Sequence, residues 1–125
     1  MKKLVDSTEG FYTEKNSKFI CHLFAVSDPD EVSEIVKAEK KKYYDARHHC
    51  YAYVIGDDGS LVKCSDDGEP SGTAGRPMLD ILQKEGLTDI LCVVTRYFGG
   101  TLLGTGGLVR AYSSALKDAI EKSTF

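Results

Sequence analysis

Five consecutive residues of this chain, Ile90 to Val94, are all apolar. Continuously apolar strands are typical of the centre of a sheet. We therefore predict a strand over residues 89–97 and expect it to be central. The chain has 125 residues, which is the size of a single domain. One sheet with its packed helices should then account for residues 1–125.

Periodicity and capping signals predict the other elements. Asp28, Pro29 and Glu31 are typical of a helix start, with an N-cap, a proline in the first turn and a capping-box carboxylate. Gly86 is typical of a helix end. We predict strands at 17–26, 47–55 and 60–65, helices at 29–42, 78–85 and 106–122, and a short strand that can precede them at 10–13. The order β-α-β-β-α-β-α predicts an α+β two-layer sandwich, a four-stranded sheet with the helices on one face.

The segment Gly56-Asp57-Asp58-Gly59 predicts a tight hairpin turn between two of these strands. If the turn is symmetric about Asp57 and Asp58, the numbers of paired residues add up to 115. That register places His49 opposite Asp66 and His48 opposite Asp67.

Ten of the twelve glycines lie in two stretches, residues 56–75 and 99–107. Glycine allows close approach of the backbone to another group. The second stretch opens the last helix, whose free amides and positive dipole end can hold an anion; the alternative role is close helix–sheet packing. Neither a Walker A loop nor a GxGxxG fingerprint is present. We predict that loops 65–77 and 98–107 meet in space and form the site.

The arginines support a site at these loops. Arg76 and Arg110 lie near helix starts, where a cation is disfavoured, and Arg96 ends the central strand. Each needs a compensating partner, either an external anion or one of Asp66, Asp67 and Glu69. We expect at least one arginine–carboxylate contact.

Metal binding and covalent catalysis receive little support. His48 and His49 are adjacent on a strand and point to opposite faces. Cys50 shares a face with His48, but no fourth ligand is suitably spaced and GxSxG is absent. The four cysteines form no CxxC, and we interpret them as reduced, mostly buried thiols. We predict no metal and no cofactor.

The charge balance argues against binding that rests on general attraction to phosphates. The chain carries 16 basic and 19 acidic residues, a net charge of −3, whereas nucleic-acid-binding domains usually have a basic excess. RNA binding would have to use a local patch, for example the arginines with Lys40–Lys42, a run that is otherwise a solvated helix end.

No apolar run approaches about 18 residues and no secretory signal is present. We expect a cytoplasmic protein without membrane contact.

Long motifs resemble those of a known family. Asp66-Asp67-Gly68-Glu69-Pro70, Thr95-Arg96-Tyr97-Phe98-Gly99-Gly100 and Gly106-Gly107-Leu108-Val109-Arg110 resemble the N-terminal domain of the YigZ/IMPACT family. The resemblance implies a fold like domain IV of elongation factor G and the second domain of a small-subunit ribosomal protein, with a left-handed crossover. It also implies that the second, ferredoxin-like domain of bacterial members is absent from residues 1–125. Eukaryotic members act in translational control, and no catalytic residue is carried over.

Two functional hypotheses follow. The first is a translation-linked binding domain that contacts RNA, the ribosome or a translation-control protein, with nucleic acid as the favoured ligand class. The alternative is an uncharacterised enzyme that uses a His/Asp/Arg cluster near the glycine-rich loops. Tyr97 and Phe98 either stack on bases or pack in the core. The predicted binding residues are His48, Asp66, Asp67, Glu69, Arg76, Arg96, Tyr97, Gly99, Gly100, Gly106, Gly107 and Arg110.

Overall fold

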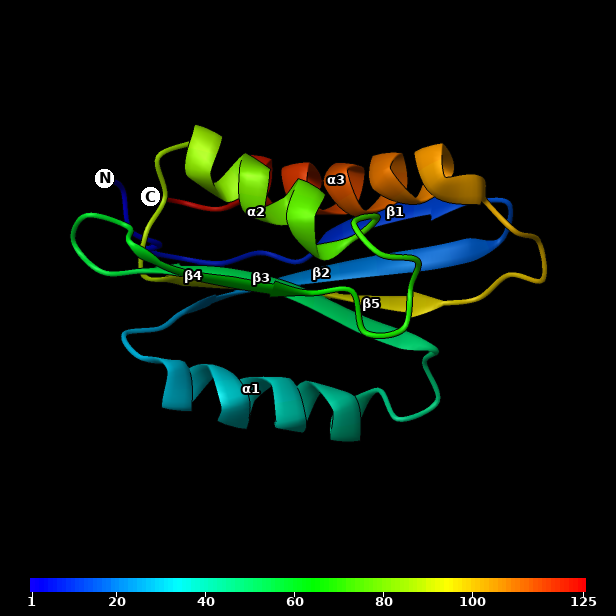
Figure 1. Cartoon of the computed structure of the whole chain (residues 1–125), viewed down its shortest axis with the longest axis horizontal. Helices are drawn as coiled ribbons and strands as arrows, with labels where there is room; N and C mark the ends of the chain where they lie inside the picture. The colour runs from blue at the N-terminus through cyan, green and yellow to red at the C-terminus, as the bar shows by residue number, and fades with distance from the viewer.

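The computed structural model describes all 125 residues and has an α+β fold with five strands and three helices (Figure 1). The elements are β1 (Gly10–Glu14), β2 (Ser17–Ala25), α1 (Pro29–Lys42), β3 (His48–Ile55), β4 (Leu61–Ser65), α2 (Gly75–Lys84), β5 (Ile90–Tyr97) and α3 (Gly104–Lys122). None of these helices is long and apolar enough to cross a membrane.

One antiparallel sheet contains all five strands in the order β1-β2-β5-β3-β4. The central position predicted for β5 is confirmed. The predicted strand count of four is wrong, because the short strand predicted at 10–13 forms over residues 10–14, pairs with residues 17–21 of β2 and adds a fifth strand. Lys15 and Asn16, both with positive φ, form the turn between β1 and β2.

The helices lie on both faces of the sheet, so the predicted two-layer sandwich is wrong. In Figure 1, α2 and α3 cover one face and α1 covers the other. Successive side chains of a strand point to opposite faces. In β5, Cys92 and Val94 join the core under α2 and α3, whereas Leu91 and Val93 join a second core with α1.

This layering makes the two helical crossovers differ in hand. All neighbouring strands are antiparallel, so β2 is parallel to β3 and β4 is parallel to β5. Both crossovers pass over one intervening strand, but α1 and α2 lie on opposite faces. One of the two is therefore left-handed, an uncommon arrangement.

The hairpin register differs by one residue from the prediction. Ile55 pairs with Leu61, so the numbers of paired residues add up to 116 and not 115. The amide of Ser60 donates to the Asp58 carboxylate at 3.1 Å, which makes Ser60 part of a five-residue loop. The turn is therefore not symmetric about Asp57 and Asp58.

The helix starts agree with local capping signals only in part. Asp28 caps α1 as predicted and accepts from the Glu31 amide at 3.0 Å. The Glu31 carboxylate accepts from the Ser27 amide, one residue earlier than in a capping box. Helix α2 begins at Gly75 rather than Met78, and α3 begins at Gly104 rather than Gly106.

Candidate functional site: a cleft between two glycine-rich loops

The two glycine-rich loops meet beside the end of β5, as predicted. They enclose a cleft of about 260 Å³. The cleft is lined by Arg47, His48, Glu69, Pro70, Arg96, Phe98, Leu102, Leu103, Gly104, Thr105 and Leu108. The first loop contributes Glu69 and Pro70, and the second contributes most of the apolar wall.

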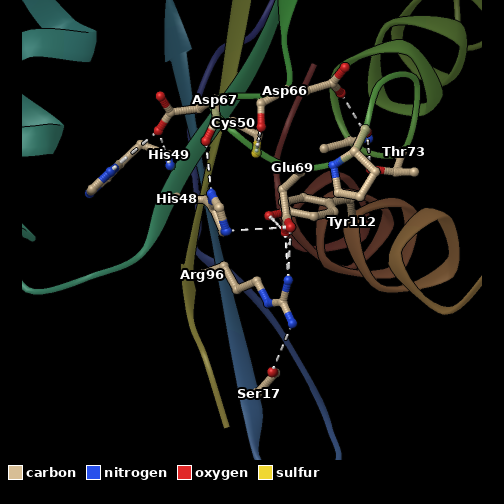
Figure 2. Close-up of polar contacts among 12 residues, drawn as sticks. Ser17, His48, His49, Cys50, Asp66, Asp67, Glu69, Thr73, Arg96 and Tyr112 are labelled. Carbon is tan, nitrogen blue, oxygen red and sulfur yellow. Dashed lines mark hydrogen bonds and ion pairs between the residues drawn. The ribbon is translucent and has the colours of Figure 1, made fainter. Parts of the chain in front are cut away.

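A buried ion pair fastens the first loop to β5 at the base of the cleft. Nη1 of Arg96 donates to Glu69 Oε1 at 2.9 Å and to Oε2 at 2.7 Å (Figure 2). The Arg96 and Glu69 side chains are only 5% and 3% exposed. Charge-assisted hydrogen bonds of this kind are stronger than neutral ones. The predicted arginine–carboxylate contact is confirmed, and Arg96 is the arginine that makes it.

Two further side chains lie at the same carboxylate. The Tyr112 hydroxyl donates to Glu69 Oε2 at 2.6 Å, and His48 Nε2 lies 3.4 Å from Oε1. Burial raises the pKa of the Tyr112 hydroxyl, which keeps its proton and remains a donor. Ser17 Oγ accepts from Arg96 Nη2 at 3.3 Å and from the Gly99 amide at 3.1 Å. Glu69 is thus the centre of a buried network whose other side chains come from β2, β3, β5 and α3.

His48 is held in one orientation. Its Nδ1 donates to the backbone carbonyl of Asp67 at 2.8 Å, because a carbonyl can only accept. The predicted proximity of His48 to Asp67 is confirmed. The predicted proximity of His49 to Asp66 is wrong, since the His49 amide donates to the Asp67 carboxylate at 2.7 Å. The one-residue change in register accounts for this difference.

Asp66 organises the first loop rather than the cleft. Its carboxylate accepts from the backbone amides of Gly72, Ala74 and Gly75, at 2.9, 3.1 and 2.8 Å. Two of these amides lie at the start of α2, whose N-cap residue, Ala74, has no side chain that can accept a hydrogen bond. Asp66 therefore caps α2 from a position eight residues before that N-cap.

The Cys50 thiol beside this network acts as a hydrogen-bond donor. Cys50 Sγ donates to the Asp66 carbonyl at 3.1 Å, and burial raises the pKa of this thiol. The prediction of buried thiols is confirmed for Cys21, Cys50 and Cys92, while Cys64 is half-buried, and all four are unbridged. No three His, Cys, Asp or Glu side chains are grouped so that they could hold a metal ion.

The structure does not bring all predicted site residues together. Arg76 pairs with Asp80 on the exposed side of α2, and Arg110 lies 3.7 Å from Glu14 of β1. Neither lines the cleft. Lys40 lies on α1, on the opposite face of the sheet from α3, and contacts Asp67 at 3.4 Å. The arginines and Lys40–Lys42 therefore form no continuous basic patch.

The remaining predicted residues support the second loop. The Tyr97 hydroxyl donates to Asp45 at 3.1 Å. Gly99 packs on the backbone of Asn16 and Ser17, where a Cβ atom would overlap it. Gly100 has a φ of 92°, a conformation that favours glycine. Gly106 and Gly107 belong to the first turns of α3.

Sequence reasoning missed several site residues. Ser17 and Tyr112 belong to the buried network, and Arg47 and Leu102 line the cleft. Tyr112 carried a usable signal: it lies in the apolar stripe of α3, where a buried hydroxyl needs a hydrogen-bond partner. Arg47 carried none, because its role depends on the ring of Phe98, which lies 4.5 Å from its guanidinium carbon and 51 residues later in the chain.

Sequence relatives cover most of the chain. The protein is 51% identical to IMPACT family member YvyE of Bacillus subtilis, over 85% of this chain and 49% of that protein. It is 46% identical to IMPACT family member YigZ of Escherichia coli, over 88% and 55%. The chain thus spans about half the length of the curated relatives it matches.

Solved structures share the fold. A crystal structure described only as that of a hypothetical protein superposes with a TM-score of 0.92 at 41% identity, over 97% of this chain and 60% of that one. The two-domain translational regulator Yih1 superposes with a TM-score of 0.59 at 22% identity, over 98% and 48%, a likeness in fold. The model of the Impact N-terminal domain matches residues 15–120. The chain therefore belongs to the Impact N-terminal domain family.

Proposed function

We propose that this chain is a binding domain in translation-linked regulation and that the cleft between the glycine-rich loops is its binding surface. The observation that carries the proposal is the cleft itself. It combines an apolar wall with charged groups that are already held in place by internal hydrogen bonds. A preformed concave site of this kind suits binding, because its side chains are already ordered and lose little conformational entropy when a ligand binds.

Binding accounts for the polar groups better than catalysis does. Glu69 already accepts from Arg96 and Tyr112, and Nε2 of His48 lies 3.4 Å from that same carboxylate. A general base needs a free lone pair within reach of a substrate proton. The Cys50 thiol donates to a carbonyl and stays protonated. These contacts support a rigid base for the cleft and give the alternative, an enzyme, less support.

A protein partner is favoured over RNA or the ribosomal RNA surface. Arg76, Arg96 and Arg110 each pair with a carboxylate of the chain itself. Phosphate binding relies on cations that are free to replace released counterions. The partner class we propose is therefore a protein of translational control.

The relatives support the translation link. The solved structure of Yih1, which shares the fold, is described as a translational regulator. Protein IMPACT-B of Xenopus tropicalis is 39% identical over 74% of this chain and 30% of that protein. A shared domain is compatible with a shared regulatory setting, and the rest of each relative can add its own partners.

The test is affinity capture from cell extract, with and without nuclease, followed by sucrose-gradient sedimentation. We expect translation factors or ribosomal proteins to be captured and to persist after nuclease treatment. Leu102→Ser, at the exposed rim of the cleft, should reduce capture, whereas Leu61→Ser, exposed on β4 and outside the cleft, should not. Capture of no translation component above an unrelated control protein would overturn the proposal.

A further inference from the structure

One arginine at the cleft has no carboxylate partner. Arg76, Arg96 and Arg110 are ion-paired, but Arg47 lies against the ring of Phe98, with its guanidinium carbon 4.5 Å from the ring centroid. Arg47 is exposed and lines the cleft. This cation–π contact positions the guanidinium and leaves its N–H groups available to a ligand.

A second cation donor in the cleft is buried and unused. Arg96 Nε has no hydrogen-bond partner, although Nη1 and Nη2 of the same side chain do. The Arg96 residue is 4% exposed and lines the cleft. A buried N–H group without a partner is costly. An acceptor brought by a ligand would remove that cost.

The start of α3 adds a third attraction for negative charge. This 19-residue helix begins at Gly104 and has no side-chain cap, and Gly104 and Thr105 line the cleft. Its opening amides and dipole favour an anion. Glu14 approaches the same turn beside Gly107, but it lines no part of the cleft and its charge is matched by Arg110.

Apolar side chains form the other wall. Phe98, Leu103 and Leu108 line the cleft, and Leu102 stands at its rim with 82% of its surface exposed. An exposed leucine beside an apolar cleft suits contact with an apolar side chain of a ligand.

We propose that the cleft binds an acidic peptide segment that carries an apolar side chain. A ligand carboxylate lies between Arg47, Arg96 Nε and the start of α3, and a neighbouring leucine-like side chain packs against Phe98, Leu102 and Leu108. The inference rests on the proposed function and specifies the chemistry of the partner. An acidic peptide is favoured over RNA because one wall of the cleft is apolar and can take a leucine-like side chain, which RNA does not have.

The probe is the peptide Ac-Asp-Leu-Glu-Leu-Asp-NH₂, titrated into the ¹⁵N-labelled chain and followed by NMR. The neutral control is Ac-Asn-Leu-Gln-Leu-Asn-NH₂, and the nucleic-acid control is an oligouridylate of eight nucleotides. We expect the largest shifts at the amides of residues 98–107. Arg47→Gln should weaken acidic-peptide binding at least about fivefold, because it removes charge-assisted hydrogen bonds to the ligand carboxylate. Lys63→Gln, which removes an equal charge from exposed β4, should leave binding unchanged.

The inference is overturned if the acidic peptide binds no better than the neutral one, if its shifts lie outside the cleft, or if Arg47→Gln binds it as tightly as the wild type. It is also overturned if the oligouridylate shifts the cleft and the peptide does not. These failures are distinct from failure of the proposed function. If translation components are captured in a way that depends on Leu102 but the acidic peptide does not bind, only the further inference is refuted. If the peptide binds but no translation component is captured, only the translation link is refuted.

Discussion

Arg96 and Glu69, 27 residues apart in the chain, form a buried ion pair in which Nη1 lies 2.7 Å from Oε2 and 2.9 Å from Oε1. Arg96 belongs to the central strand β5 and Glu69 to the loop before α2. The pair therefore fastens that loop to the sheet and forms the base of the cleft (Figure 2). Two expected outcomes depend on this pair.

Loss of Arg96 should be strongly destabilising. Arg96→Met leaves the Glu69 carboxylate buried without its cation, and breaking a buried pair in this way costs ~3–5 kcal/mol. The free energy of unfolding, measured in urea, should fall by about that amount. Arg76→Met is the control, because the exposed Arg76–Asp80 pair should be worth less than about 1 kcal/mol. A loss within about 1 kcal/mol for Arg96→Met would contradict this view of the pair.

Removing both charges should cost less than the two single losses together. In Glu69→Leu/Arg96→Met no uncompensated charge remains, and apolar replacements of buried pairs are often tolerated. A double-mutant cycle in urea measures the coupling, which we expect to exceed about 1 kcal/mol. Additive losses would show that the two side chains act independently.

Two glycines of the second loop and α3 should respond in opposite directions to alanine. A Cβ at Gly99 would overlap backbone atoms of Asn16 and Ser17, whereas none would be met within 4 Å at Gly106. Overpacking against backbone costs ~1–3 kcal/mol, so Gly99→Ala should lower the melting temperature clearly. Gly106→Ala should leave stability unchanged or raise it by up to about 1 kcal/mol, because alanine favours the helix. Equal effects of the two substitutions would refute the close packing of Gly99.

Asp66 should stabilise the fold only when it is ionised. Burial acts to raise the pKa of its carboxyl, but hydrogen bonds from the amides of Gly72, Gly75 and Ala74 outweigh this and hold the pKa below its ordinary value of 3.8. A lowered pKa gives stability that is present above 3.8 and is lost as pH falls through the folded-state pKa. Asp66→Ala should cost ~1 kcal/mol at neutral pH. Urea unfolding should show this difference shrink at acidic pH; a difference that grows on acidification would contradict it.

His22 should show the opposite pH dependence. Its Nδ1 lies 3.3 Å from Glu39 of α1 and its Nε2 lies 3.2 Å from Glu9. Contact with the Glu39 carboxylate raises the pKa of His22 above its ordinary value of 6.5, despite the opposing effect of burial. The stabilisation is therefore fully present below pH 6.5 and is lost as pH rises through the folded-state pKa.

Comparison of the wild type with His22→Gln in urea tests this. The difference in unfolding free energy should be largest near pH 5 and should narrow towards pH 8. An NMR titration of His22 supplies a direct check, and an inflection below pH 6.5 would contradict the expected direction. Glu39→Gln should remove most of the pH dependence, because Glu39 is the main cause of the raised pKa.

Local sequence signals determined the order of the elements and most of their bounds. The apolar run of residues 90–94 predicted the central strand β5, and Asp28 predicted the start of α1, because both depend on neighbours in the chain. The same run carried a further signal: a strand that is apolar on both faces needs cover on both. That signal favours the observed position of α1 on the opposite face from α2 and α3.

Only the tertiary structure decided which distant groups meet. The early start of α2 depends on Asp66, and the hairpin register depends on a side-chain contact of Asp58 within the loop. The glycines and arginines predicted that a site exists, but four arginines and several carboxylates allow many pairings. Arg96 is buried and pairs with Glu69, because a charge removed from water needs a partner at hydrogen-bond distance. Arg47 is exposed to water, so it needs no carboxylate partner and contacts the Phe98 ring instead.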